Sequence, residues 1–190
     1  MTSPVRILQL DAGTLRALAD GDLAAADRTS PVPLTSYLAG LECRSAWARR
    51  ARQVVEDPAS AGWITGVVWD PDRRLAVGRA GFHGPLDDTG MVEVGYSIDP
   101  QHRRQGYARA ALRALVDRAT REPGVTTVRA SVSPDNVASR DLVLSEGFVA
   151  VGEQMDEEDG LEIVYEVGVG SSSQTSGVDV PDRQSRRSTP

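Results

Sequence analysis

A glycine and two arginines stand between a strand-like segment and the most clearly amphipathic helical segment of the sequence, within residues 96–108. The first backbone N–H groups of a helix have no intrahelical partner, and the helix dipole adds partial positive charge there. Gly106 allows close approach of the backbone, Ala108 leaves the first turn unobstructed, and Arg103 and Arg104 add full charges. This pattern predicts a pyrophosphate cradle that needs neither lysine nor metal. The alternative is a plain strand-to-helix turn with two solvated arginines.

A second motif follows the cradle, in the next predicted strand–helix unit: Asn136-x-x-Ser139-x-x-Leu142, and then Gly147-Phe148. Together with Arg103-x-x-Gly106-x-Ala108, it resembles the cofactor-binding region of the GNAT superfamily of N-acetyltransferases, in its RimJ/RimL-like branch. Residues 93–98, Glu-Val-Gly-Tyr-Ser-Ile, are similar to the strand that precedes the cradle in that branch. The specific resemblance covers residues 90–150.

The resemblance implies an α/β fold, with a mixed, mostly antiparallel twisted sheet of about six to seven strands flanked by helices. It implies acetyl-CoA as cosubstrate, no metal, and an amine acceptor, which is a small molecule or a peptide N-terminus. It also implies a backbone N–H donor to the thioester carbonyl within residues 96–98. The expected contacts to the cofactor are Tyr96, Ser97, Ile98, Arg103, Arg104, Gln105, Gly106, Tyr107, Ala108, Asn136 and Ser139.

Glu93 is the candidate general base, because an amine must lose its proton before or during attack on a thioester. By alternation along residues 91–98, Glu93 shares a face with Gly95 and Ser97, opposite Val94 and Tyr96. In the family, this part of the strand borders the cleft. The alternative reading is a structural carboxylate that pairs with a nearby arginine.

Ser139 is the candidate acid for the departing thiolate, as in the RimJ/RimL-like branch. The tyrosine that many relatives carry seven residues after the asparagine is Val143 in this sequence. Ser139 could equally cap the helix start, a common role for serine. Asn136 is expected to contact the pantetheine or the backbone. A free thiolate is a tolerable leaving group, so the reaction can also proceed without an acid.

Other polar residues are weaker candidates for the site. His83 either lines the acceptor side or stands in an exposed loop, and His102 is expected to be solvated. Cys43 is expected to be a small buried side chain rather than a nucleophile. The acidic run Asp156–Asp159 is either a solvated turn or a rim that concentrates a cationic acceptor.

The periodicity of hydrophobic residues predicts the strands and helices that position these residues. The order of elements is β-α-α-β-β-β-α-β-α-β-β. Gly147 is expected to end the last helix, and Gly95 hints at a local bulge. Strands are predicted at 4–10, 63–69, 75–82, 91–98, 125–132, from 148, and at 160–167, and helices at 14–19, 34–56, 106–121 and 136–146.

Composition narrows the range of functions. All 21 basic residues of the 190-residue chain are arginines, which excludes lysine-dependent P-loop, protein-kinase and pyridoxal-phosphate chemistry. A single cysteine excludes an internal disulfide framework, and two histidines cannot make a His-rich metal site. A net charge of −6 is atypical of a nucleic-acid binder. The sequence shows no signal segment or membrane span, so we expect a cytoplasmic protein without a membrane partner.

We expect one acetyltransferase domain at residues 1–168 and a disordered polar tail at 169–190, where Ser, Thr and Gly replace apolar residues. A homodimer is possible, since dimers are common among relatives. The leading function is direct acetyl transfer to an amine in a ternary complex. One alternative is a catalytically quiet acyl-CoA-binding sensor or partner module. Another is a phosphate-binding α/β domain for a different nucleotide, which would not require the second motif.

Overall fold

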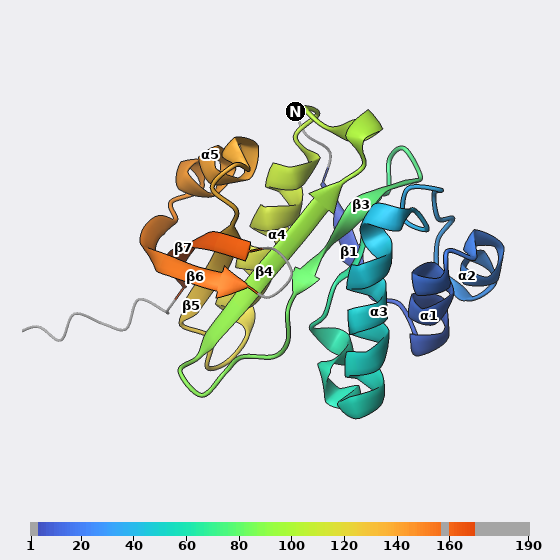
Figure 1. Cartoon of the computed structure of the whole chain (residues 1–190), viewed down its shortest axis with the longest axis horizontal. Helices are drawn as coiled ribbons and strands as arrows, with labels where there is room; N and C mark the ends of the chain where they lie inside the picture. The colour runs from blue at the N-terminus through green and yellow to red at the C-terminus, as the bar shows by residue number, and fades with distance from the viewer. Residues whose placement is uncertain (1–3, 157–159, 170–190) are drawn as a thin grey trace, which may run out of the picture.

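A seven-stranded sheet forms the centre of the computed structural model, which describes residues 4–156 and 160–169 (Figure 1). Its strand order is β1-β2-β3-β4-β5-β7-β6, and every neighbouring pair is antiparallel except β4 and β5. The expected mixed, mostly antiparallel sheet is therefore confirmed. The strands are β1 (Arg6–Leu8), β2 (Gly66–Asp70), β3 (Leu75–Phe82), β4 (Met91–Ile98), β5 (Thr127–Val132), β6 (Val149–Asp156) and β7 (Gly160–Gly168).

Helices cover both faces of this sheet, because alternate strand residues point to opposite sides. In β2, Val67 packs into a core with α1 and α3, whereas Val68 packs into a second core with α4. Figure 1 shows α3 and α4 on opposite sides of β3 and β4. The helices are α1 (Ala12–Asp20), α2 (Leu23–Thr29), α3 (Leu41–Glu56), α4 (Tyr107–Arg121) and α5 (Val137–Ser145), with short 3₁₀ turns at Pro58–Gly62 (η1) and Pro100–His102 (η2).

The N-terminal third differs from the expected helices. The helix predicted from residue 34 begins only at Leu41, because Gly40 has an extended backbone (φ −71°, ψ 161°). The apolar residues of segment 34–40 fill the core with α1 and α3 rather than forming a helical stripe; they are Leu34, Tyr37, Leu38 and Ala39. Helix α2 was not among the predicted elements. The Asp22 carboxylate caps its first turn by accepting a hydrogen bond from the Ala25 N–H (2.8 Å).

Strands β4 and β5 separate partway along their length. Their parallel pairing covers only Met91–Glu93 and Thr127–Arg129, while β4 continues to Ile98 beside β3. The β3–β4 register is unbroken from Val94 to Ile98, so the bulge suggested by Gly95 is wrong. The divergence leaves a wedge-shaped opening next to the second half of β4, bordered by the strand's own backbone.

The chain stays packed against the sheet for one residue past β7, into the predicted tail. Val169 is buried and donates its backbone N–H to the Thr126 carbonyl at 2.9 Å. The remaining tail residues, 170–190, lie outside the described residues, as do residues 157–159 of the acidic run. Within the described part of the chain, the helices are too short or too polar to cross a membrane.

Candidate active site

One cavity, of about 530 Å³, lies where β4, α4 and α5 converge. Every expected cofactor contact lines it except Gln105, which is exposed and accepts a hydrogen bond from Arg73 Nη1 at 2.9 Å. The fold thus brings the two sequence motifs to one place although about thirty residues separate them. His102, expected to be solvated, also contributes to the wall. The lining residues are Tyr96, Ser97, Ile98, His102, Arg103, Arg104, Gly106, Tyr107, Ala108, Arg109, Asn136, Ala138, Ser139 and Leu142.

Gly106 shapes the floor of this cavity. It is the N-cap of α4 and has a left-handed backbone (φ 87°), with Arg104 also left-handed at φ 60°. This backbone path has positive φ on both sides of Gln105, and α4 begins immediately after it with unpaired N–H groups at its first turn. Arg103 fastens the loop to the sheet, because its Nε donates to the Ile98 carbonyl at 3.0 Å.

Tyr107 anchors the first turn of α4. Its hydroxyl donates to the Asp70 carboxylate at 2.7 Å in the interior of the protein. Burial by itself raises the pKa of Asp70, but hydrogen bonds from Tyr107 and from the Arg73 and Asp72 N–H groups outweigh it and hold the pKa below its ordinary value. The buried charge is therefore satisfied, and it keeps the helix N-terminus at a defined height above the sheet.

Ser139 reaches across the cavity to Tyr96. Their hydroxyl oxygens are 2.7 Å apart, and burial raises the pKa of Tyr96, so the phenol stays protonated at neutral pH. The Asn136 side chain caps α5 by accepting a hydrogen bond from the Ser139 N–H at 3.1 Å. The cap that the sequence analysis considered for Ser139 is thus supplied by Asn136, and the Ser139 hydroxyl is left to face Tyr96.

The backbone of β4 presents donors to the same opening. His83 N–H bonds to the Glu93 carbonyl and Asp99 N–H bonds to the Val77 carbonyl, so the odd-numbered residues of β4 pair with β3. By alternation, the N–H groups of Tyr96 and Ile98 point the other way, toward β5. Since the β4–β5 pairing ends at Glu93, these groups face the opening between the strands.

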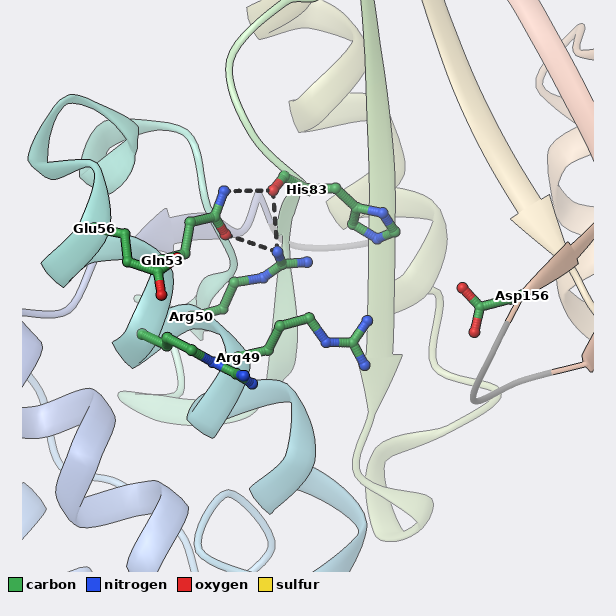
Figure 2. A pocket seen from close by; sticks show the side chains of 7 residues that line it. Arg49, Arg50, Gln53, Glu56, His83 and Asp156 are labelled. Carbon is green, nitrogen blue, oxygen red and sulfur yellow. Dashed lines mark hydrogen bonds between the residues drawn. The ribbon is translucent and has the colours of Figure 1, made fainter.

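A second cavity, of about 600 Å³, lies on the α3 side of β4 (Figure 2). Figure 2 shows Arg49 and Arg50 reaching from α3 toward β4, with Asp156 of β6 on the far side. The His83 imidazole stands beside the strand. Arg52, Gln53 and Glu56 of α3 complete the lining. The sequence shows the cluster of arginines, but only the packing of α3 reveals that it faces this cavity.

Glu93 lies on the same face of β4 as Gly95 and Ser97, next to His83. Its Oε1 accepts a hydrogen bond from Ser131 Oγ at 2.6 Å, and Gln154 donates to the same serine at 3.0 Å. Its Oε2 is 3.8 Å from His83 Nδ1. The carboxylate is thereby oriented by β5 and β6, with its second oxygen turned toward the histidine.

His83 follows β3 directly and lies over Gly95, where an added Cβ would come within 2.9 Å of Nε2. The glycine therefore provides room for the imidazole. Burial lowers the pKa of His83, the Glu93 charge raises it, and the nearby arginines lower it further, for a net decrease. The side chain remains 45% exposed, so it is neutral near pH 7 and reachable from the cavity. His83 thus lies in the exposed bend after β3 and also lines the α3-side cavity, so its position is compatible with both places considered for it.

The remaining candidates differ in position. Cys43 is fully buried, and burial raises the pKa of its thiol, so it is not placed as a nucleophile. Asp156 lines the second cavity, whereas the other three acidic residues of its run lie outside the described residues. The described residues contain no cluster of three or more His, Cys, Asp or Glu side chains suited to a metal ion.

Solved structures of similar shape include a spermidine N-acetyltransferase chimera from Vibrio cholerae and the human enzyme hSSAT, with TM-score 0.63, 16% identity, and coverage of 88% of this chain and 96% of that one. A ribosomal-protein-S5-alanine acetyltransferase from Vibrio fischeri matches with TM-score 0.59 and 19% identity over 86% and 91% of the two chains. A phosphinothricin acetyltransferase from Sinorhizobium meliloti, in complex with AcCoA, matches with TM-score 0.54 and 17% identity over 90% of each chain. At these identities, the likeness establishes the fold alone.

Sequence comparison identifies two uncharacterised N-acetyltransferases of Bacillus subtilis as similar. YjdG is 29% identical over 96 residues, 50% of this chain and 57% of that protein, and YoaA is 33% identical over 90 residues, 46% and 51%. The chain thus spans about half the length of the curated relatives it matches. A family model described as an acetyltransferase (GNAT) domain matches residues 14–149. With the cofactor-side cavity and the separated strands, this match establishes that the chain belongs to the GNAT acetyltransferase family.

Proposed function

We propose that the protein transfers an acetyl group from acetyl-CoA to a primary amine by direct attack in a ternary complex. The observation that carries the proposal is the convergence of the two sequence motifs on one cavity beside the unpaired end of β4. On the other face of the same strand, Glu93 lies 3.8 Å from His83, which lines the α3-side cavity. Strand β4 thus offers a place for the thioester on one side and a base for the amine on the other.

Acetyl-CoA would place its pyrophosphate over Gly106. The first N–H groups of α4, the left-handed backbone at Arg104 and Gly106, and the two arginines supply partial and full positive charge there. From this point the pantetheine would run along the unpaired edge of β4. The N–H of Tyr96 would then donate to the thioester carbonyl and stabilise the negative charge that develops during attack.

Proton removal would pass through His83 to Glu93. A neutral imidazole can accept the proton of an ammonium group, and the Glu93 carboxylate, 3.8 Å away, stabilises the charge or receives the proton through one water molecule. Ser131 and Gln154 hold the carboxylate in the required orientation. We therefore keep Glu93 as the proposed base and add His83 as its relay.

Ser139 would protonate the departing CoA thiolate. Its hydroxyl faces the cavity and is 2.7 Å from the Tyr96 hydroxyl, which can return a proton to it. When the tetrahedral intermediate collapses, the C–S bond breaks, the new amide C–N bond remains, and the sulfur takes the serine proton. The Tyr96 hydroxyl thus gives Ser139 a source of protons that an isolated serine would lack.

The decisive experiment measures CoA release from acetyl-CoA with a panel of amines, amino acids and peptides, alongside calorimetric binding of CoA. The proposal predicts CoA binding and amine-dependent thiol release. Binding without release for any acceptor would favour the quiet acyl-CoA-binding module. Binding of ATP or NAD in preference to CoA would favour a domain for another nucleotide and contradict the proposal.

A further inference from the structure

The α3-side cavity is bordered by a buried arginine that has no carboxylate partner among the described residues. Arg50 is 7% exposed. Its Nε donates to Thr65 Oγ1 at 3.3 Å, and its Nη1 donates to Gln53 Oε1 at 2.9 Å and to the His83 carbonyl at 3.0 Å. All three acceptors are neutral. These bonds leave the second terminal nitrogen, Nη2, without a partner among the described residues, and Figure 2 shows it on the side of the guanidinium that faces β4.

The burial of Arg50 lowers the pKa of its guanidinium group. Burial, together with the charges of Arg49 and Arg79 and against the opposing charge of Glu93, lowers this pKa to about 10. A buried cation without a matching anion is unfavourable unless something compensates it. Positions that retain such a charge commonly serve a functional site.

A second guanidinium, that of Arg79, lies outside the lining of both cavities, near Tyr37 and Cys43. Arg79 of β3 stands opposite Ser97 of β4, and its buried Nε has no hydrogen-bond partner. Ser97 itself is bound to the Tyr37 hydroxyl at 2.7 Å. The charge of Arg79 also contributes to the lowered pKa of His83. Two arginines thus act on the region where the acceptor amine must lie.

The described acids nearby do not neutralise these two cations. Glu93 is bound by Ser131 and faces His83, and it forms no ion pair with Arg50 or Arg79. Asp156 stands across the cavity on β6 (Figure 2). Glu56 also lines the cavity, and it forms no ion pair with Arg50. Arg50 therefore has no carboxylate partner among the described residues.

We propose that the acceptor is an amine that itself carries a carboxylate, such as a free amino acid, and that Arg50, assisted by Arg79, binds this carboxylate. This inference rests on the proposed acetyl transfer and specifies its substrate class. The guanidinium fork suits a planar carboxylate, and the anchored acid directs the amine of the same molecule toward His83. The positive field also favours the neutral form of that amine, which is the form that attacks. Polyamines, whose additional charges are positive, are disfavoured.

The test compares amino acids with their amides, which keep the amine and lose the charge. We expect kcat/KM for the best amino acid to exceed that of its amide by about 10-fold or more, since a hydrogen bond to a charged group contributes about 1.5–3 kcal/mol. The amine of an amino-acid amide loses its proton more readily than the amine of the free amino acid. This difference favours the amide, so it cannot produce the expected preference for the acid. Equal or higher kcat/KM for the amide, or for spermidine, would overturn the inference in favour of an acidic-rim site.

Variants of Arg50 and Arg79 test whether these side chains cause the preference for the amino acid over its amide. Arg50→Gln and Arg79→Gln should raise KM for the amino acid by about 10-fold while changing KM for the amide less than about 3-fold. Arg50→Lys is a second variant, used if the buried amide of Arg50→Gln prevents folding. Binding of CoA to each variant shows whether it is folded. Arg121→Gln, which removes an exposed guanidinium of α4, is the control. Equal losses for acid and amide would contradict carboxylate recognition.

The inference and the proposed function can fail separately. If no amine releases thiol, calorimetry of each acid–amide pair with the CoA-bound protein still measures carboxylate recognition. Preference for the acid, lost in Arg79→Gln, would then sustain the carboxylate site while acetyl transfer is rejected. Thiol release without any preference for the acid would sustain acetyl transfer and reject the carboxylate site.

Discussion

Alternation along β4 separates the chemical roles of neighbouring residues. Glu93, Gly95 and Ser97 face α3, where the acceptor would enter, and Tyr96 faces α5 and the cofactor-side cavity. The N–H groups of the even-numbered residues face the opening between β4 and β5. One extended segment can therefore provide a base, a carbonyl donor and a thiol-side contact without any of them competing for space.

Glu93→Gln should lower kcat by about 10²–10⁴-fold if this carboxylate takes the proton. The amide can still accept the Ser131 hydrogen bond, so the strands should stay in place. Steady-state rates with saturating acetyl-CoA measure the effect, and CoA calorimetry should give an unchanged Kd. A rate within about 3-fold of wild type would return Glu93 to a structural role.

The acid limb of the kcat/KM profile should lie below pH 6.5. Burial and the neighbouring arginines lower the pKa of His83 from 6.5, so the imidazole remains neutral to a lower pH and is protonated, with loss of relay activity, only below that value. Arg49→Gln removes one of these positive charges and should shift the limb upward. The profile is best measured at low ionic strength. An acid limb above pH 6.5, or one that does not move in the Arg49→Gln variant, would exclude His83 as the relay.

Ser139→Ala and Tyr96→Phe should each lower kcat by about 10- to 100-fold near neutral pH, because both break the hydroxyl chain to the thiolate. The loss should shrink as the pH rises through the thiol pKa, about 8.5 for a cysteine-like thiol, since the leaving group then needs no proton. Ser145→Ala, on the same helix but outside the cavity, is the matched control. A loss that is independent of pH would point to positioning alone.

At the scale of elements, the start of α4 links stability to ligand binding. The left-handed Gly106, the Arg103 bond to β4 and the buried Tyr107–Asp70 pair all set the place of one helix terminus. Because α4 also buries Leu112 and Leu115 against the sheet, its N-terminus is fixed by the core and by the loop together.

Gly106→Ala should destabilise the fold by about 1–2 kcal/mol, because a Cβ strains the left-handed backbone. We also expect the Kd for CoA to rise by about 10-fold, which corresponds to about 1.4 kcal/mol. Gly147→Ala is the control, since Gly147 has nearly the same φ (88°) at the end of α5 and open space around an added Cβ. It should lower Tm comparably and leave the Kd unchanged. Equal effects of both variants on the Kd would argue against the cradle.

At the scale of the whole molecule, the packing of the residues after β7, an interior strand of the sheet, shows how far the described domain extends. Val169 packs into the core beyond the end of β7, and its N–H bonds to Thr126. The domain that the structure describes therefore includes residue 169, one residue past the boundary expected from composition.

Removal of residues 170–190 should leave Tm and the CoA Kd unchanged, as measured by thermal unfolding and calorimetry. A truncation after Glu166 also removes Val167, Gly168 and Val169, and with them buried contacts and pairing with β5. It should lower Tm by at least about 3 °C for a chain of this size. A drop in Tm on removal of 170–190 alone would assign that segment a structural role.

Sequence alone determined the strand at 91–98, the two motifs and the break after α5 at Gly147, because these depend on short-range periodicity and local backbone geometry. The sheet class followed from the family that the two motifs resemble. The sequence also identified Glu93 and Ser139 as candidates. It merged residues 34–40 with α3 and missed α2, because buried apolar residues look alike in helices and in packed turns. Only the tertiary structure placed His83 over Gly95 and the arginines of α3 beside Glu93, because those neighbours come from separate elements whose relative positions are set by packing across the sheet.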